Sequence, residues 1–199
     1  MSQVIEYYFA PQSPWTYLGH QRLQDIAAAA GARIEVLPAD LGRIFPLSGG
    51  LPLPKRAPQR QAYRLVELAR FSQHLGLPLN VHPRHFPVPA DDAARLIIAV
   101  QQHDGDLAAL ALAGAVMRAV WVDERNIADA DTLAALLAEC GLDSARADDA
   151  RAPAAQQAYQ ANTDRAIARG VFGAPTYAVD GELFWGQDRL DFLQRRLAA

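Results

Sequence analysis

Ser13 and Thr16 are the first residues of the chain whose types and spacing could do chemistry. Both belong to the segment Ser-Pro-Trp-Thr that follows the apolar run Val4–Phe9. Serine before proline predicts a helix start, with Ser13 as the N-cap and Pro14 as the first helical residue. The positive end of a helix dipole favours an anion, and the Ser13 hydroxyl could donate a hydrogen bond to one. The alternative is a plain N-cap that contributes about 1 kcal/mol to stability.

Ser13 is not expected to act as a nucleophile by itself. A serine hydroxyl has a high pKa and needs a base beside it, but the nearest side chains in the sequence are those of Trp15 and Tyr17. The hydroxyl is better suited to binding a thiolate that a ligand brings with it.

The segment Gly-Val-Phe-Gly-Ala-Pro-Thr at 170–176 is a second candidate site. A proline directly before a predicted strand, with a small residue in front of it, suggests a cis peptide bond in a tight turn. The backbone N–H and C=O of Ala174 could then pair with an extended peptide ligand. The alternative is an ordinary loop proline.

The third candidate is the segment Trp-Gly-Gln-Asp-Arg at 185–189. Asp188 is predicted to cap the last helix, with Asp191 in the acidic position of that cap. A carboxylate at this point could bind an ammonium group, while free N–H groups bind a carboxylate. The alternative is a cap followed by an arginine that faces solvent.

The elements that must position these segments begin and end as strands. Residues 4–9 and 33–37 are predicted strands around a helix at 14–30, and residues 176–179 and 182–185 are a predicted hairpin before the last helix. Residues 42–58, rich in Pro and Gly, are predicted as a loop. Between loop and hairpin the periodicity predicts helices at about 59–75, 90–103, 106–122, 130–140 and 151–169. This order predicts an α/β protein with a thioredoxin-like core (1–58 and 170–199) and an all-helical insertion (59–169).

Composition excludes several classes of function. The chain of 199 residues has 19 Lys and Arg against 22 Asp and Glu, a net charge of −3, which argues against a nucleic-acid binder. The single cysteine, Cys140, excludes an internal disulfide and a Cys-x-x-Cys redox pair, and we expect it to be a buried apolar residue. The five histidines have no metal-ligand spacing, so no metal is expected.

We expect no membrane segment and a cytoplasmic location. The beginning of the chain has no basic region before its apolar stretch, and Glu6 interrupts that stretch. The longest uncharged apolar run, 107–117, has eleven residues, whereas a span needs roughly 20.

Taken together, the three segments resemble the 2-hydroxychromene-2-carboxylate isomerases, a family of the DsbA-like, kappa-class glutathione transferase group. The resemblance covers essentially the whole chain and implies glutathione as the cofactor. In thioredoxin-like folds the helix start carries the reactive thiol, and here Ser13 and Thr16 stand in its place. The resemblance implies that Ser13 contacts the sulfur of glutathione as the catalytic residue and that Ala174 pairs with its backbone. It also implies that the γ-glutamyl end is held by Trp185, Gly186, Gln187 and Asp188.

The substrate side departs more from the family. A lysine that the family has after the second strand is absent here, where Ile44 and Phe45 stand. A basic segment could instead bind an aromatic carboxylate, although a solvated helix face is the alternative for each of its residues. The candidates are Lys55, Arg56, Arg60, Arg64 and Arg84, with Phe86 as an aromatic contact. Residues 123–150, by contrast, carry eight acids and two arginines.

The resemblance implies a glutathione-dependent cis–trans isomerase. It would interconvert 2-hydroxychromene-2-carboxylate and trans-o-hydroxybenzylidenepyruvate by reversible thiolate addition, in the catabolism of aromatic compounds. We expect a small aromatic carboxylate as its partner and consider a homodimer possible. The alternatives are a kappa-like glutathione transferase, which would release a stable adduct, and a non-catalytic thioredoxin-like module that binds thiols or peptides.

Overall fold

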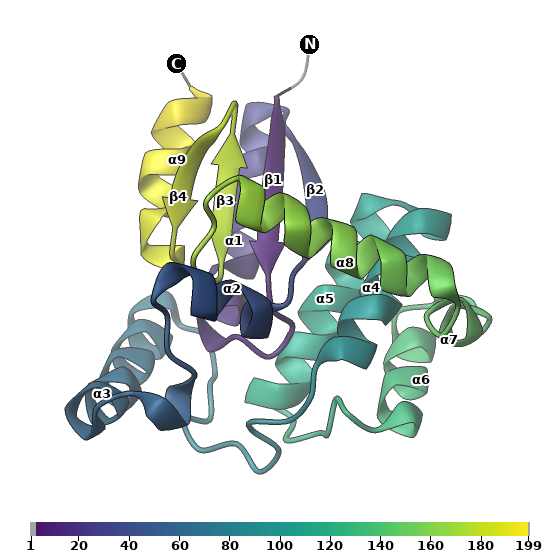
Figure 1. The fold of residues 1–199 in the computed structure, drawn as a ribbon, viewed down its shortest axis with the longest axis horizontal. Helices are drawn as coiled ribbons and strands as arrows, with labels where there is room; N and C mark the ends of the chain where they lie inside the picture. Colours follow the sequence, from purple (N-terminus) through teal and green to yellow (C-terminus); the bar gives the residue numbers. More distant parts are fainter. Residues whose placement is uncertain (1–2, 199) are drawn as a thin grey trace.

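A mixed sheet of four strands with helices on both faces forms the centre of the computed structural model, which describes residues 3–198 (Figure 1). The strands are β1 (Val4–Phe9), β2 (Arg33–Pro38), β3 (Thr176–Val179) and β4 (Glu182–Trp185), in the spatial order β2-β1-β3-β4. β1 is parallel to β2 and antiparallel to β3, and β3 is antiparallel to β4. The predicted strands are therefore confirmed, and the sheet joins the two ends of the chain.

The strand register brings the three candidate segments to one edge of the sheet. Tyr8 near the end of β1 pairs with Thr176 at the start of β3, and Thr176 pairs with Trp185 at the end of β4. The residues that follow β1, precede β3 and follow β4 therefore meet at this edge, although about 160 residues separate Ser13 from Ala174 in the chain.

Alternate residues of β1 contribute to different core clusters on the two faces of the sheet. Ile5, Tyr7 and Phe9 lie in the larger cluster, together with apolar residues of α1 (Pro14–Ala30) and α9 (Leu190–Leu197). Tyr8 lies in a smaller cluster with residues of α8 (Pro153–Ala168). Apolar clusters thus lie on both faces of the sheet, which is packed between helices on both sides (Figure 1).

Helix α1 begins and ends where the sequence predicts. Ser13 is its N-cap, Pro14 is its first residue, and Gly31 ends it in the left-handed conformation with φ +63°. Glycine adopts this conformation without the steric cost of a Cβ atom, so the helix stops there. The hairpin is likewise confirmed, with Asp180 (φ +50°) and Gly181 (φ +86°) at its turn.

The predicted loop at 42–58 is wrong in part. Leu41–Ser48 forms helix α2 despite Pro46 inside it, and Leu53–Lys55 forms a short 3₁₀ helix. Asp40 caps α2 by accepting a hydrogen bond from the Gly42 N–H at 2.7 Å, and Ile44 is buried beneath it. Tertiary burial of Ile44 thus overrides the local signal of proline and glycine.

The insertion contains the predicted helices and one short helix that was not predicted. They are α3 (Pro58–Leu75), α4 (Asp91–Asp104), α5 (Asp106–Trp121), α6 (Ala130–Glu139), the short α7 (Arg146–Asp149) and α8. Leu110 and Trp121 of α5 are buried, whereas Leu107 is 83% exposed because it lies in the first turn of the helix.

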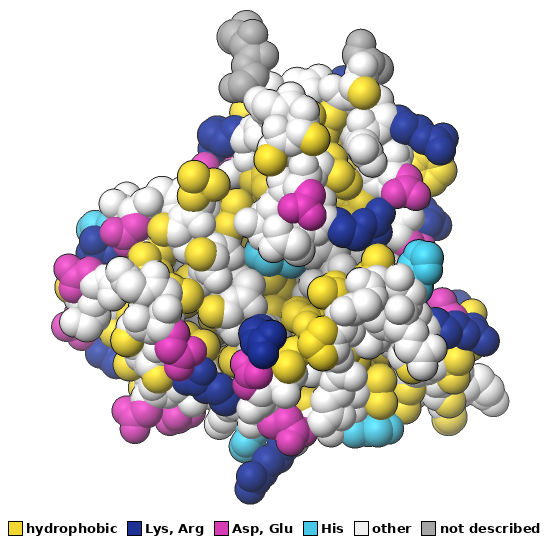
Figure 2. Space-filling view, turned by 180° about the vertical axis from the view of Figure 1, so that it is seen from behind, with side chains coloured by type: hydrophobic (Ala, Val, Ile, Leu, Met, Phe, Trp, Pro, Cys, Tyr) yellow, Lys and Arg dark blue, Asp and Glu magenta, His cyan; other side chains and the backbone are white. Residues whose placement is uncertain are grey.

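The surface carries charges of both signs side by side. On the face shown in Figure 2, Lys and Arg side chains alternate with Asp and Glu and do not gather into one basic area. Across residues 3–198, no helix combines the length and the hydropathy that crossing a membrane requires.

Candidate active site

Ser13 presents its hydroxyl at the first turn of α1. The Thr16 N–H donates a hydrogen bond to Ser13 Oγ at 3.3 Å, so the cap uses a lone pair of the oxygen and leaves its hydrogen available. The first turn contains no acidic residue that would neutralise the helix dipole. The predicted N-cap is confirmed, and the geometry allows Ser13 to donate a hydrogen bond to an anion at the same time.

Ala174 offers an open backbone edge next to this helix start. The Ala174–Pro175 peptide bond is cis, as predicted. Within residues 3–198, the backbone N–H and C=O of Ala174 have no hydrogen-bond partner, and the residue is partly exposed. A free donor and acceptor on one residue are what an extended peptide needs for strand-like pairing.

Trp185 forms an aromatic wall beside Ala174 together with Phe172, a residue that the sequence reasoning did not single out. Their ring centroids lie 4.7 Å apart, and both rings are about half exposed. The indole of Trp185 lies directly over Gly173, where a Cβ atom would collide with its Nε1. An exposed aromatic two residues before Ala174 was the available signal for Phe172.

The residues after Trp185 are arranged differently from the prediction. Asp188 does not cap the last helix: it lies inside a 3₁₀ helix, Gln187–Arg189, and its carboxylate pairs with Arg189 at 2.7 Å. Helix α9 then begins at Leu190 without a side-chain cap, and Asp191 pairs with Arg22 of α1. The predicted cap, formed by Asp188 and Asp191, is absent because the 3₁₀ helix continues directly into α9.

Gln187 is buried, so its side chain cannot contact a ligand at the surface. It is 1% exposed, and it lies against Gly19 of α1, where an added Cβ would be 2.7 Å from Gln187 Cβ and 2.8 Å from the Tyr177 hydroxyl. Only the backbone of Gln187 can contribute to a site, and the Gly186 N–H is already donated to Pro175 O at 2.8 Å.

Helix α3 is held against the start of α1. Trp15 meets Phe71 edge to face with centroids 6.0 Å apart, and the Tyr17 hydroxyl donates to Pro78 O at 2.7 Å in the loop after α3. The helical insertion therefore contributes one side of the surroundings of Ser13.

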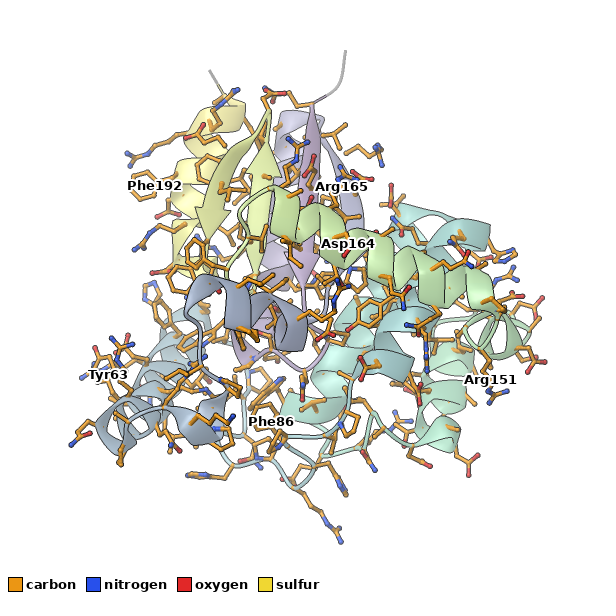
Figure 3. All side chains as sticks on the ribbon, viewed as in Figure 1. Tyr63, Phe86, Arg151, Asp164, Arg165 and Phe192 are labelled. Atoms are coloured by element: carbon orange, nitrogen blue, oxygen red, sulfur yellow. The ribbon has the colours of Figure 1, made fainter. Side chains whose placement is uncertain are left out.

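The predicted cations on this side differ sharply in their surroundings. Lys55, Arg60 and Arg84 are exposed, while Arg56 is half-buried and donates from Nε to Leu51 O at 2.8 Å. Arg64 is also half-buried, and its guanidinium lies 5.4 Å from the centroid of Phe86 and 5.9 Å from that of Trp121. Figure 3 shows Phe86 in the space between α3 and α5. Burial, reinforced by the neighbouring charge of Arg56, lowers the pKa of Arg64 to about 10.

Beneath the site, α1 is joined to the sheet by a buried histidine that was not predicted to matter. His20 is bonded on one side to the Tyr7 hydroxyl at 3.1 Å and on the other to Leu110 O at 3.0 Å. Burial lowers the pKa of His20 to about 4, so the ring is neutral near pH 7.

Neither of two surface hollows is lined by Ser13 or Ala174. The larger, of about 680 Å³, lies beside the C-terminal half of α1, where Arg33 and Asp106 already form an ion pair at 2.7 Å. The smaller, of about 350 Å³, is lined by Ile44, Leu47 and Phe172, one of the two residues of the aromatic wall. Neither brings an unpaired charge to a helix start, so Ser13 remains the better candidate centre.

Other candidate chemistry is weaker among the described residues. Residues 3–198 contain no group of three or more His, Cys, Asp or Glu that could hold a metal ion. Cys140 is half-buried, and burial, aided by the charge of Glu139, raises the pKa of its thiol. A thiol with a raised pKa is a poor nucleophile.

Comparisons with known proteins confirm the resemblance and the fold. A model of the DsbA-like thioredoxin domain matches residues 4–198. The chain is 31% identical to 2-hydroxychromene-2-carboxylate isomerase of Sphingobium xenophagum, over 99% of each chain. It is 24% identical to glutathione S-transferase kappa 1 of Rattus norvegicus, over 96% of this chain and 89% of the relative. A solved structure of 2-hydroxychromene-2-carboxylate isomerase superimposes with a TM-score of 0.82 at 30% identity, covering 98% of this chain and 94% of that one.

Proposed function

The chain belongs to the DsbA-like thioredoxin domain family and, within it, to the group of isomerase enzymes named for 2-hydroxychromene-2-carboxylate, and from this we propose that it is a glutathione-dependent cis–trans isomerase. Its substrate pair would be 2-hydroxychromene-2-carboxylate and trans-o-hydroxybenzylidenepyruvate. The observation that carries the proposal is a helix start with a free hydroxyl, Ser13, beside the open backbone edge of Ala174.

The residues at this edge fit a tripeptide thiol. The unpaired N–H and C=O of Ala174 match the backbone of an extended peptide, and the half-exposed ring of Trp185 borders the same place. The chain has no cysteine at the helix start, where the dipole would otherwise stabilise a thiolate of its own. A ligand that supplies the thiol completes this arrangement.

Each residue has a distinct proposed role. Ser13 donates its hydroxyl hydrogen to the sulfur of glutathione and, with the helix dipole, lowers the pKa of that thiol from its free value of about 8.5. Ala174 pairs with the peptide backbone. The γ-glutamyl end is held by Trp185, the backbone N–H of Gln187 and the carboxylate of Asp188, for which Gly186 leaves room because a Cβ there would collide with Oδ1. Asp188 would share its charge between Arg189 and the ligand ammonium.

When bound, glutathione would supply a thiolate for reversible addition to the conjugated carbon of the ring-opened substrate, whose double bond would be a rotatable single bond until the thiolate left. The chain's part is to keep the thiol deprotonated at Ser13 and to hold the substrate carboxylate with a cation of the α3 side. Ring opening breaks the C–O bond of the chromene, and the proton of its 2-hydroxyl group ends on the phenolic oxygen, so the isomerisation balances without an oxidant, a reductant or a net gain of protons. We place the reaction in the cytoplasm, where small thiols are abundant.

The test combines an ultraviolet assay with a thiol titration. Interconversion of the chromene carboxylate and the trans enone should require catalytic amounts of glutathione, and thiolate absorbance should show a lowered pKa for the bound thiol. Interconversion at the same rate without glutathione would contradict the proposal.

A kappa-like glutathione transferase is the second candidate, favoured by the similarity to the rat kappa-class enzyme. It shares the thiol site, so the products separate the two: a stable glutathione adduct would identify a transferase. Binding of glutathione with no lowering of its thiol pKa would instead identify a non-catalytic module.

A further inference from the structure

Arg64 is a half-buried cation without a counter-ion. Its surroundings within residues 3–198 are two aromatic rings, Phe86 and Trp121, and a second cation, Arg56, while no carboxylate pairs with it. By contrast, Arg70 on the same helix is exposed and pairs with Glu67 at 2.7 Å. Removing an unpaired charge from water is costly, and a neighbouring like charge adds to the cost.

The contacts of Arg64 only partly offset this cost. Stacking a guanidinium on aromatic rings contributes about 1 kcal/mol each in partly buried positions. The centroids of Phe86 and Trp121 are 4.7 Å apart, so both rings lie on the same side of the guanidinium, and its N–H donors have no acceptor within residues 3–198. Trp121 is fully buried, and its Nε1–H also lacks an acceptor among the described residues. Arg64 thus offers a positive charge and unpaired N–H donors, which are the groups that bind an anion.

Arg64 lies on the face of α3 that is turned toward the helix start. Phe71, which contacts Trp15 near Ser13, follows Arg64 by seven residues, and residues seven apart share a helix face. The two are therefore about 10 Å apart along the helix axis, since each residue rises about 1.5 Å. A substrate whose reactive carbon is near Ser13 can extend its acid group along this face.

We propose that Arg64, seated on Phe86 and Trp121 and assisted by Arg56, binds the substrate carboxylate and selects planar, conjugated carboxylates. This inference rests on the proposed function only in that the carboxylate is taken to belong to its substrate. A carboxylate would supply the missing acceptors for the guanidinium edge, and a flat conjugated skeleton would fit against Phe86, the partly exposed ring of the two. Among the candidates of the sequence, Arg64 is thereby preferred over the exposed Lys55, Arg60 and Arg84.

The experiment measures binding, not turnover. trans-2-Hydroxycinnamate and its uncharged amide are titrated by calorimetry into the full chain and into Arg64→Gln, Arg64→Lys and Arg70→Gln. Hydrogen bonds to a charged group contribute enough that Arg64→Gln should weaken the carboxylate about 10-fold to 100-fold and leave the amide unchanged. Arg64→Lys should retain part of the affinity, because it keeps the charge but not the planar fork, and Arg70→Gln should bind like the wild type.

Three results would overturn the inference: equal carboxylate binding by Arg64→Gln and wild type, equal loss of carboxylate and amide, or no carboxylate binding by the wild type. Far-ultraviolet circular dichroism of each variant confirms that it is folded, and Arg64→Lys retains the charge if Arg64→Gln fails to fold. The thiol pKa of bound glutathione is measured separately in the same proteins. A normal thiol pKa would reject the proposed function while leaving the carboxylate result to stand or fall alone.

Discussion

The Tyr7 hydroxyl and His20 Nδ1 lie 3.1 Å apart and join the central strand of the sheet to the helix that carries Ser13. His20 Nε2 lies 3.0 Å from Leu110 O, which can only accept, so this nitrogen carries the hydrogen. Nδ1 therefore accepts the hydrogen of Tyr7. The chain of three groups is satisfied only while His20 is neutral, because a protonated Nδ1 would donate to the Tyr7 oxygen and leave the Tyr7 hydrogen without its acceptor, and the charge would be buried.

The protein should become less stable as the pH is lowered, because His20 titrates. Its pKa in the folded chain, about 4, lies below the ordinary value of 6.5, so the unfolded chain takes up the proton first. The stabilisation is complete above pH 6.5 and is lost as the pH falls toward 4. We expect the free energy of unfolding, measured with urea, to be about 2 kcal/mol lower at pH 5 than at pH 7 because of this group.

Two variants isolate the contribution of His20. His20→Gln cannot titrate, so its free energy of unfolding, although lower, should change little between pH 7 and pH 5. His82→Gln removes an exposed histidine and should keep the pH dependence of the wild type. A wild-type protein equally stable at both pH values would show that His20 is not buried as described.

Ser13→Ala should affect the chemistry more than the fold. Loss of the cap costs about 1 kcal/mol, as measured by urea unfolding. On the proposed mechanism it also removes a hydrogen bond to the thiolate, so the thiol pKa of bound glutathione should rise by about 1 and turnover should fall about tenfold, with little change in glutathione affinity.

Asp129→Ala is the matched control for Ser13→Ala. Asp129 caps α6 by accepting from the Thr132 N–H at 3.0 Å, so its loss should cost similar stability. Turnover should stay at the wild-type level, because α6 does not touch Ser13. If both variants lost turnover equally, the effect of Ser13 would be one of stability alone.

Helix ends that depend on neighbouring residues could be predicted from the sequence, whereas a helix that depends on distant contacts could not. Ser13 and Gly31 predicted the ends of α1 because an N-cap and a left-handed glycine act within a few residues. Helix α2 was missed because it depends on partners far along the chain: the Asp40 N–H donates to Thr163 Oγ1, 123 residues away, and Arg43 pairs with Asp164. Figure 3 shows Asp164 on α8, which supplies both contacts.

For the candidate site too, residues could be identified from local patterns, but their positions in space could not. Ala174 could be identified from the local pattern before Pro175, whereas its position beside the helix start depends on the register of Tyr8 with Thr176. The basic residues could not be ranked from the sequence, because charge type is local but burial and pairing are tertiary. Arg64 and Arg60 are one turn apart on α3, yet only Arg64 is partly buried against aromatic rings.

Gly173→Ala should displace Trp185. A Cβ at this position would collide with the indole, so either the ring or the backbone must shift, at a cost of about 1–2 kcal/mol. We expect a change in tryptophan emission and weaker glutathione binding. In a Trp185→Leu background the same substitution should cost much less, and a double-mutant cycle measures the difference. Equal costs in both backgrounds would mean that Gly173 does not act through Trp185.

Arg165→Gln should loosen α8 from the sheet. Arg165 forms ion pairs at 2.8 Å with Glu6 of β1 and Glu35 of β2, and Figure 3 shows it on α8 over the sheet. Burial alone would raise the pKa of Glu6, but hydrogen bonds from Tyr8 and Arg165 outweigh it and lower the pKa. Breaking a partly buried network of this kind costs about 2 kcal/mol in urea unfolding.

Arg151→Gln serves as the control for Arg165→Gln. Its pair with Asp148 is largely exposed, with 66% and 87% of the side chains accessible, so its loss should cost less than about 0.5 kcal/mol. Lowering the pH should reduce the difference between wild type and Arg165→Gln, since protonation of Glu6, whose pKa is lowered, removes one of the two ion pairs. A difference that persists below pH 3 would point to lost packing of the arginine stem.

Arg64→Met should stabilise the unliganded protein. In the absence of a carboxylate, Arg64 is a cation held out of water beside Arg56, and only ring stacking offsets that cost. An unbranched apolar side chain can fill the same space, and replacing buried charges by apolar residues of similar volume is often neutral or stabilising. We expect a gain of about 1 kcal/mol in the free energy of unfolding, measured with urea.

Saturating trans-2-hydroxycinnamate should raise the stability of the wild type but not of Arg64→Met, because the variant has no guanidinium to bind it. If Arg64→Met were instead destabilised by several kcal/mol, the guanidinium would be a structural element of the core and not a residue kept for binding.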